Sequence, residues 1–379
     1  MTPNLCDLFV CAGEKSGDLL GGRLLEALYA QKPTLAIQGV GGIAMRSTAM
    51  HCFIPTEELQ VMGFVDVLCA FFRLRRLFYA IAKEILRLNP KVVITIDYPG
   101  FNLRLAKYLR KQGFRGKLVH FVCPSVWAWG KRRIPLMEKN LDLLLSILPF
   151  EKKLFTNTQM RTAFVGNPLA ERICSYTYKP FPMGKPLLSL FPGSRTKEIE
   201  RNLPVMLDAA KSIKKQQDTL HIALSVSEEK FLPLMKTILK KKGWKEEELH
   251  WVPSELAYEL MKASHLAIAK SGTVTLELAL HKVPTVVVYA LSFLDRLIAQ
   301  YLLRIRLPFY CLVNIIAGRS VFAELIGPHL TLLRLEKEVK ALFDEPTRRR
   351  IQKECDLLLD ELSGKHPSEV AAREILNFS

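Results

Sequence analysis

Residues 187–198 read LLSLFPGSRTKE. The first five residues form a short apolar run, which is typical of a buried strand in a parallel sheet. Pro192 and Gly193 then mark a turn, and Thr196 and Glu198 are typical of the first turn of a helix. The stretch therefore predicts a strand, a tight turn and a helix N-terminus, the unit from which doubly wound α/β folds are built.

The same alternation of apolar runs and amphipathic stretches continues on both sides of this unit. The predicted strands are Leu5–Val10, Leu35–Gln38, Val92–Ile96, Leu118–Val122, Leu143–Ile147, Ala163–Val165, Leu187–Phe191, Leu220–Val226, Leu249–Val252, Leu266–Ala269 and Thr285–Tyr289. The predicted helices are Gly17–Ala30, Arg75–Leu88, Asn102–Lys111, Arg133–Lys139, Ile199–Ile213, Glu228–Leu239, Leu256–Ala263 and Val274–Leu280. This rhythm predicts an α/β protein with two Rossmann-like domains that face a cleft.

The length and the punctuation of the chain set the predicted boundaries. A chain of 379 residues fits two domains better than one core. A turn at residues 166–168 and a Pro/Gly-rich stretch at residues 179–186 interrupt the rhythm. We predict a first Rossmann-like domain at residues 1–167, a linker at 168–186, a second Rossmann-like domain at 187–345 and a C-terminal helical tail at 346–379 that packs back on the first domain.

The composition describes a basic globular protein. Apolar residues make up 49% of the chain and charged residues 24%, which excludes a disordered chain. The excess of Lys and Arg (54) over Asp and Glu (37) gives a net charge of +17, which favours anionic partners such as nucleic acids, phosphorylated molecules or acidic lipids.

Targeting signals and cysteine pairs are not evident in the sequence. The longest apolar runs, such as Val283–Leu294, are shorter than a membrane span, and the N-terminus does not resemble a signal peptide. The eight cysteines form no C-x-x-C pair, which favours reduced thiols and a cytoplasmic protein.

Two turns in the second half are candidates for binding phosphate. At the first, Gly193 lets the backbone approach a ligand, Ser194 follows it, and Arg195 offers a guanidinium suited to phosphate oxygens. Thr196 and Glu198 can equally be capping residues. The second turn comprises Ser271, Gly272 and Thr273, and Glu277 follows one helical turn later, where it could accept hydrogen bonds from ribose hydroxyls.

Two turns in the first half carry carboxylates. Residues 11–18 read CAGEKSGD, whose glycine spacing fits neither a dinucleotide fingerprint nor a P-loop. Ser16 or Asp18 can serve as a helix cap here, yet Glu14 makes the turn more polar than a cap requires. Asp97 follows a predicted strand and is either a capping residue or a cleft carboxylate that could deprotonate an acceptor hydroxyl. No cluster of residues with metal-ligand spacing is evident, so we expect no metal site.

Two stretches, Val61–Tyr79 and Leu291–Phe309, are both apolar and basic. They predict either core helices with a solvated basic face or a surface for anionic lipid and acyl chains. The candidate surface residues are Phe71, Phe72, Arg73, Arg75, Arg76, Arg304 and Arg306. Because no known nucleic-acid-binding signature is present, we expect no nucleic acid partner.

Taken together, seven motifs resemble the lipid-A-disaccharide synthase family. They lie collinearly at residues 12–18 (AGEKSGD), 96–102 (IDYPGFN), 124–129 (PSVWAW), 148–152 (LPFEK), 192–195 (PGSR), 271–273 (SGT) and 314–319 (NIIAGR). The segments at 124–129 and 12–18 are the specific ones, whereas those at 192–195 and 271–273 are shared by many nucleotide-sugar enzymes. The segment at 96–102 departs from the family at Gly100, where a second Asp is usual. Lys15 and Asn167 are two further departures.

The resemblance implies a GT-B fold and an inverting, metal-independent glycosyltransferase without a cofactor. Such enzymes move 2,3-diacylglucosamine from its UDP derivative to 2,3-diacylglucosamine 1-phosphate (lipid X), giving a β-1,6-linked disaccharide 1-phosphate and UDP. They work at the cytoplasmic face of the Gram-negative inner membrane, as peripheral proteins on its anionic surface, and a homodimer is a family expectation.

The resemblance also makes residues 1–167 the acceptor-binding domain and residues 187–345 the UDP-sugar-binding domain, and it assigns roles to single residues. Arg195 and the turn at 271–273 would hold the diphosphate, and Glu277 the ribose. Asp97 would be the base, Glu14 and Ser16 would line the cleft, and Asn314 would reach the donor or the base. The alternatives are another UDP-sugar enzyme of the GT-B fold, namely a 2-epimerase or a lipid-linked GlcNAc transferase, and a non-enzymatic binder of anionic lipid or nucleic acid.

Overall fold

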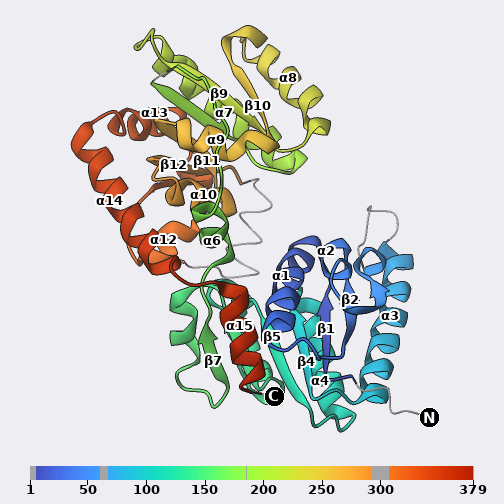
Figure 1. Ribbon diagram of the computed structural model, residues 1–379. Coiled ribbons are helices and arrows are strands. Elements are labelled where there is room, and N and C mark those ends of the chain that lie inside the picture. The colour runs from blue at the N-terminus through green and yellow to red at the C-terminus, as the bar shows by residue number, and fades with distance from the viewer. Residues whose placement is uncertain (1–5, 60–66, 185, 292–306, 379) are drawn as a thin grey trace. The chain divides into compact units, whose positions relative to one another are not determined.

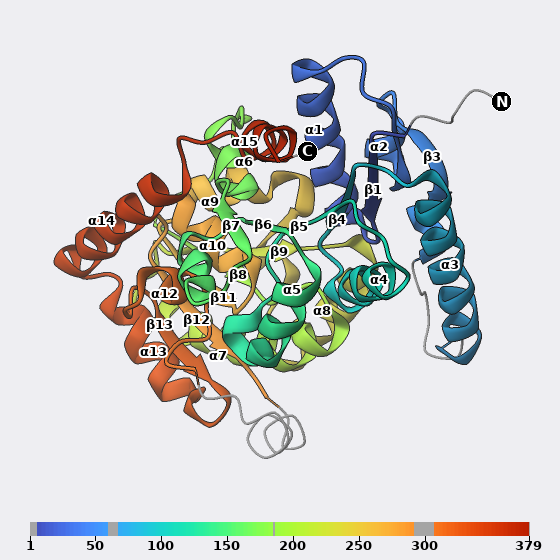
Figure 2. The ribbon, with the colours of Figure 1, turned by 90° about the horizontal axis from the view of Figure 1, so that it is seen from below.

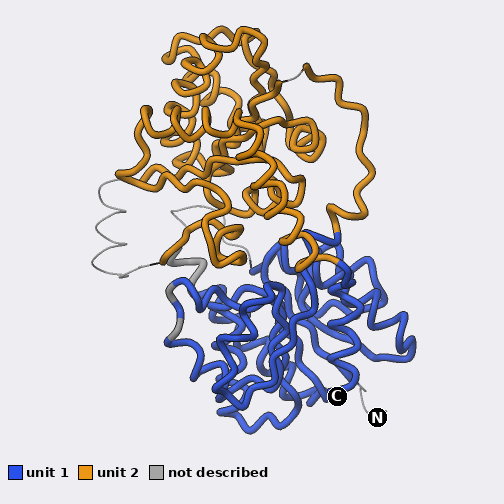
Figure 3. Tube along the Cα trace, turned by 90° about the vertical axis from the view of Figure 1, so that its left-hand side faces the viewer, with its two compact units in different colours: residues 1–171, 364–379 blue, residues 172–363 orange. Residues whose placement is uncertain are grey.

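The computed structural model describes residues 6–59, 67–184, 186–291 and 307–378. The chain forms two compact units (Figure 3): unit 1 comprises residues 1–171 and 364–379, and unit 2 comprises residues 172–363. Residues 346–379, predicted as one helical tail, are thus divided between the two units.

Unit 1 is built on a sheet of seven parallel strands in the order β3-β2-β1-β4-β5-β6-β7 (Figure 1). The strands are β1 Leu8–Ala12, β2 Ile37–Gly41, β3 His51–Pro55, β4 Val92–Ile96, β5 Lys117–Phe121, β6 Leu143–Ser146 and β7 Arg161–Phe164. Alternate residues of β1 enter different cores: Phe9 and Cys11 pack on one side, and Leu8 and Val10 on the other. Both faces of the sheet are therefore buried, as the continuous apolar strands require.

Helices cover both faces of this sheet. They are α1 Lys15–Gln31, α2 Ile43–Arg46, α3 Val67–Leu88, α4 Pro99–Lys111, α5 Ile134–Asn140 and α15 Pro367–Leu376. Helices α3, α4 and α5 contribute to one core, and α1, α2 and α15 to the other. The last helix lies beside the first (Figures 1 and 2), so the C-terminal end of the chain does pack back on the N-terminal unit.

Unit 2 repeats the topology with six parallel strands in the order β10-β9-β8-β11-β12-β13. The strands are β8 Leu187–Phe191, β9 His221–Val226, β10 His250–Pro253, β11 Leu266–Lys270, β12 Thr285–Tyr289 and β13 Ala323–Ile326. The helices are α7 Thr196–Lys214, α8 Leu232–Lys241, α9 Ala257–Ala263, α10 Thr273–Leu280, α12 Leu312–Ala317, α13 Leu332–Ala341 and α14 Glu345–Leu362. Helix α14 packs on α10 within this unit. Helix α6 (Pro168–Cys174) contains the division between the units.

The predicted α/β class is confirmed, and the two strands that sequence reasoning missed are both edge strands. β3 carries His51 and ends at Pro55, and only one of its five residues is buried. β13 contains Glu324 and also lies at the edge of its sheet. These two edge strands are covered less completely than the central strands and lack the continuous apolar run by which the central strands were found.

The strand order locates the ligand sites that such folds use. The order reverses between β1 and β4 in unit 1 and between β8 and β11 in unit 2. Ligands of open α/β sheets bind beyond the carboxyl ends of the strands at such a switch point. The four turns selected from the sequence follow these four strands, so each unit brings two of them together.

Candidate functional site

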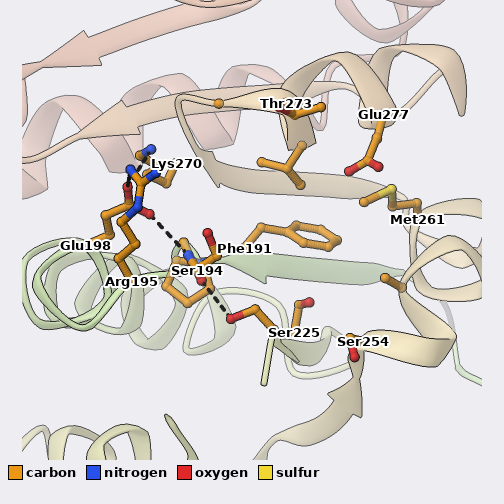
Figure 4. A pocket seen from close by; sticks show the side chains of 16 residues that line it. Phe191, Ser194, Arg195, Glu198, Ser225, Ser254, Met261, Lys270, Thr273 and Glu277 are labelled. Atoms are coloured by element: carbon orange, nitrogen blue, oxygen red, sulfur yellow. Dashed lines mark hydrogen bonds and ion pairs between the residues drawn. The ribbon is translucent and has the colours of Figure 1, made fainter. Parts of the chain in front are cut away.

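A cavity of about 510 Å³ lies at the switch point of unit 2 (Figure 4). Six of the predicted residues line it: Gly193, Ser194, Arg195, Gly272, Thr273 and Glu277. It is also lined by Phe191, Pro192, Glu198, Ser225, Ser227, Ser254, Ala257, Met261, Lys270 and Val274. The two turns that were considered separately in the sequence therefore both line one pocket.

The β8–α7 turn depends on a glycine. Gly193 has φ +125°, a left-handed conformation that a side chain disfavours. A Cβ atom at this position would also lie 2.7 Å from Oε2 of Glu198. Ser227 fixes the turn from the neighbouring strand end, since its hydroxyl donates to the Gly193 carbonyl at 3.3 Å.

The carboxylate of Glu198 contacts cationic groups from both turns of the pocket (Figure 4). Its Oε1 lies 2.9 Å from Nζ of Lys270 and 3.3 Å from Nη1 of Arg195, and its Oε2 accepts the Ser194 N–H at 3.1 Å. Burial acts to raise the pKa of Glu198, but the hydrogen bonds from Lys270 and Ser194 outweigh burial and lower it. The groups that could bind a phosphate, namely Lys270, Arg195 and the Ser194 N–H, thus already bind one anionic group, the Glu198 carboxylate.

In the β11–α10 turn, Thr273 is exposed to the cavity, whereas Ser271 does not line it. Thr273 is exposed at the first position of α10. The Ser271 hydroxyl donates to the Tyr310 carbonyl at 3.2 Å, and Ser271 does not line the cavity. Of the predicted trio, Gly272 and Thr273 are the two residues that face the pocket.

Glu277 lies on α10, and its carboxylate points into the cavity (Figure 4). Its Oε1 accepts hydrogen bonds from Nη2 of Arg172 at 3.3 Å and from the hydroxyl of Tyr258 at 3.2 Å. Burial raises the pKa of Glu277, while Arg172 and Tyr258 act in the opposite direction. Glu277 can therefore accept a hydrogen bond from a ligand, as predicted for a ribose-binding residue.

At the switch point of unit 1, the β4–α4 turn is strained. Asp97 and Tyr98 have φ values of +49° and +48°, which side chains seldom adopt. The fully buried Asn102 holds this turn, since its Nδ2 donates to the carbonyls of Ile96 and Asp97 at 3.2 and 2.7 Å. Such strain is concentrated at functional sites, where it fixes a side chain in an otherwise unfavourable position.

Three predicted residues of unit 1 meet at this turn. Ser16 Oγ lies 3.5 Å from Oδ2 of Asp97, a long hydrogen bond. Partial burial and then the charge of Asp97 raise the pKa of Glu14. Among the residues that the structure describes, neither Glu14 nor Asp97 forms an ion pair with Lys or Arg. The Glu14 carboxyl therefore keeps more affinity for a proton than an exposed glutamate does.

Asp18, read from the sequence as a possible cap of its own helix, caps another one. Its carboxylate accepts the N–H groups of Gly42, Ala44 and Met45 at 2.7–3.0 Å and so satisfies the start of α2. Glu14 is the N-cap residue of α1, but its side chain makes no capping hydrogen bond. The Glu14 carboxylate is therefore not used to cap the helix that Glu14 precedes.

Asn314 is fully buried and is held within its own unit. Its Oδ1 accepts the N–H groups of Val321 and Phe322 at 2.9 Å, and its Nδ2 donates to the Phe322 carbonyl and to Glu324 at 2.8 Å. Every hydrogen-bonding group of its amide is thus in use, and Asn314 does not line the cavity. A contact with the donor or the base would require this network to open.

Part of the predicted lipid surface is described. Phe72 is 63% exposed on α3, and Arg73, Arg75 and Arg76 are exposed beside it. The side chain of Phe71, and Arg304 and Arg306, lie outside the described residues. Among the helices described in the structure, none is long and apolar enough to cross a membrane.

Sequence reasoning missed Lys270, Arg172 and Tyr258. Lys270 had a readable signal, because it is the charged last residue of an apolar strand at a candidate phosphate turn. Arg172 and Tyr258 had none, since they reach Glu277 from sequence distances of 105 and 19 residues.

The two Rossmann-like units and the pocket at a strand switch point define a protein of the GT-B fold. A crystal structure of a putative UDP-N-acetylglucosamine 2-epimerase from Listeria monocytogenes matches with a TM-score of 0.65 at 14% identity, covering 98% of this chain and 95% of that one. The calicheamicin glycosyltransferase CalG4 matches with a TM-score of 0.56 at 13% identity, covering 98% of each chain. At these identities the likeness shows the fold alone.

The chain belongs to the lipid-A-disaccharide synthetase family, which its sequence matches over residues 8–376. It is 41% identical over 325 residues to a lipid-A-disaccharide synthase of Chlamydia pneumoniae, covering 84% of this chain but 53% of the relative. It is 34% identical over 358 residues to that of Coxiella burnetii, covering 90% of each. The chain thus spans about half the length of the chlamydial relative and nearly all of the Coxiella one.

Proposed function

We propose that the chain is a glycosyltransferase that moves 2,3-diacylglucosamine from its UDP derivative to 2,3-diacylglucosamine 1-phosphate (lipid X). The products would be a β-1,6-linked disaccharide 1-phosphate and UDP. The observation that carries the proposal is the cavity of unit 2, which lies at the switch point of its sheet in a chain of the lipid-A-disaccharide synthetase family.

The UDP moiety would bind in this cavity. Arg195, Lys270 and the N–H of Ser194 all contact the single carboxylate of Glu198. A diphosphate carries more charge than a carboxylate, so it would compete with Glu198 for these donors. Thr273 and the start of α10 face the same space, and a helix N-terminus favours a bound anion.

The acceptor hydroxyl would be deprotonated by Asp97. The resulting oxygen would attack the anomeric carbon of the donor on the face opposite UDP, which inverts the configuration at that carbon. Glu14 and Ser16 are the polar neighbours of Asp97 and would orient the hydroxyl. The strained turn supports this assignment, because it holds the carboxylate beyond the strand end.

No metal ion or cofactor takes part in the proposed reaction. The charge that develops on departing UDP would be neutralised by Arg195, by Lys270 and by the helix N-termini. Positioned donors of this kind usually make the largest single contribution to catalysis where charge develops in the transition state.

We further propose that the protein works as a peripheral protein on the anionic cytoplasmic face of the inner membrane. The exposed Phe72 beside Arg73, Arg75 and Arg76 supports this, because an apolar residue rimmed by arginines suits an interface with acidic lipids. A homodimer is a family expectation and stays a prediction.

The test is an incubation of the purified chain with UDP-2,3-diacylglucosamine, with and without lipid X, followed by mass spectrometry of the lipids and an assay of UDP. We expect the disaccharide 1-phosphate and UDP only when lipid X is present. Release of UDP without lipid X would indicate a 2-epimerase or hydrolase instead. UDP binding without any product would leave the donor site in place and contradict the proposed acceptor.

A further inference from the structure

Glu277 stands between two cavities. It lines the pocket of about 510 Å³ described above and also a second cavity of about 370 Å³, which Arg172, Tyr176 and Tyr258 line as well. Arg172 and Tyr258 do not line the first pocket. The carboxylate is therefore held from one side and faces the candidate ligand site on the other (Figure 4).

The two donors to Glu277 use the same oxygen. Nη2 of Arg172 and the hydroxyl of Tyr258 both lie within 3.3 Å of Oε1. Among the described residues, none donates a hydrogen bond to Oε2. A carboxylate oxygen can accept two hydrogen bonds, so Oε2 keeps the capacity to bind two hydroxyl groups.

The donors are themselves held in place. The guanidinium of Arg172 lies 5.4 Å from the ring centroid of Tyr258, a cation–π contact that ties the two donors together. The ring of Tyr258 packs edge-on against that of Tyr176 at 5.0 Å. Burial raises the pKa of Tyr258, so its hydroxyl stays a donor throughout the neutral range.

The charge of Arg172 also opposes the effect of burial on Glu277. Burial raises the pKa of this carboxyl, and Arg172 and Tyr258 lower it in part. A protonated Glu277 would carry one donor and would accept hydroxyl groups less well. The two partners therefore fix the direction of the carboxylate and favour its ionised form against the effect of burial.

We propose that Arg172 and Tyr258 are positioning residues that hold Glu277 so that its second oxygen accepts the vicinal hydroxyls of a ribose. The inference rests on the proposed function, since it takes the ligand of the first cavity to be a uridine diphosphate. It extends that function by giving the site a means of selecting ribonucleotides over deoxyribonucleotides, through residues that do not touch the ligand.

The test compares the affinities of the full chain for UDP and for 2′-deoxy-UDP by calorimetry. The unchanged chain should prefer UDP, since the deoxy ligand leaves part of the Glu277 acceptor capacity unused. In Tyr258→Phe and Arg172→Met we expect this preference to shrink by roughly three- to tenfold, as loss of an orienting or charge-assisted hydrogen bond implies. Loss of the cation in Arg172→Met should also raise the pKa of Glu277. As the pH is lowered, Glu277 then becomes protonated sooner, so the preference for UDP should be lost at a higher pH than in the unchanged chain.

Tyr176→Phe is the matched control. Its hydroxyl belongs to the same aromatic cluster but donates to Glu259 at 3.0 Å, so its loss should leave the preference unchanged. If Tyr258→Phe and Arg172→Met lower the affinities for UDP and for 2′-deoxy-UDP by the same factor, the two residues do not position Glu277. The inference is then overturned, while the proposed function stands. If the unchanged chain binds no UDP, the proposed function falls and the inference falls with it.

Discussion

The carboxylates at the switch points of the two units have different electrostatic surroundings. In unit 2, Glu198 is paired with Lys270 and Arg195, and Glu277 with Arg172. In unit 1, no ion pair to Glu14 or Asp97 occurs within the described part of the chain. In unit 2 the partners lower the pKa of Glu198, while at Glu277 burial outweighs Arg172 and Tyr258 and raises the pKa. In unit 1 burial and the acidic neighbour both raise the pKa of Glu14.

This difference separates two chemical tasks that one topology supports. Cations gathered around a carboxylate can be transferred to a bound phosphate, so unit 2 is suited to holding an anion. Carboxylates without cations retain affinity for protons, so unit 1 is suited to proton transfer. The strand order places both kinds of site alike, and only the partners of the carboxylates distinguish them.

The largest expected effect comes from Asp97→Asn. If unit 1 supplies the base, turnover should fall by about 10²–10⁴-fold, the usual contribution of general base catalysis, with UDP affinity unchanged. Turnover with UDP-2,3-diacylglucosamine and lipid X measures the first quantity, and calorimetry the second. Glu138→Gln, at a surface glutamate of the same unit, is the control. A near-normal rate in Asp97→Asn would move the base elsewhere.

Arg195→Met tests the anion site of unit 2. Loss of a charge-assisted hydrogen bond to phosphate should weaken UDP binding by about 10- to 100-fold, and Arg195→Lys should restore part of it. Lys197→Met is the matched control, because Lys197 is exposed on the same helical turn but does not line the cavity. Equal losses in the two methionine variants would mean that general positive charge, and not this turn, binds UDP.

A pair of glycines in unit 1 tests the strained turn. A Cβ atom at Gly13 would overlap the ring of Tyr98, whereas one at Gly100 would meet no atom within 4 Å. We expect Gly13→Ala to lower the free energy of unfolding by about 1–3 kcal/mol and Gly100→Ala to leave it unchanged or higher by up to about 1 kcal/mol. Urea titrations measure both values, and a neutral Gly13→Ala would show that Tyr98 can move aside.

Glu198→Gln should have the smallest effect on binding and the opposite sign. Because a carboxylate no longer competes with the diphosphate for Lys270 and Arg195, UDP should bind roughly two- to fivefold more tightly. A weaker affinity would mean that Glu198 arranges these donors for the ligand instead of competing with it.

The same variant gives a pH dependence. Since the folded pKa of Glu198 lies below its ordinary value of about 4.3, its contacts stabilise the fold above that pH and lose this effect as the pH falls through the lowered folded value. The difference in Tm between the unchanged chain and Glu198→Gln should therefore be largest at neutral pH and vanish in acid.

Much of the fold could be predicted because its determinants are local. The central strands Val92–Ile96, Leu187–Phe191 and Thr285–Tyr289 were found with the bounds that the structure gives them. Their continuous apolar runs follow from burial on both faces of a sheet.

The role of Asn167 was not predicted. This residue departs from the family and was given no role from the sequence. In the structure its Oδ1 accepts the Leu169 N–H at 2.9 Å and so caps α6.

The sequence by itself determined the four strand-end turns and the candidate residues on them, because a strand, a turn and a helix N-terminus are each specified within a few neighbouring residues. Only the tertiary structure decided what those residues meet. Lys270 reaches Glu198 and Arg172 reaches Glu277 because adjacent strands and packed helices bring distant segments together. Such neighbours decide whether a carboxylate lies among cations that can bind an anion or keeps its affinity for a proton. Coulomb interactions depend on the distance between charges in space and not on their separation along the chain.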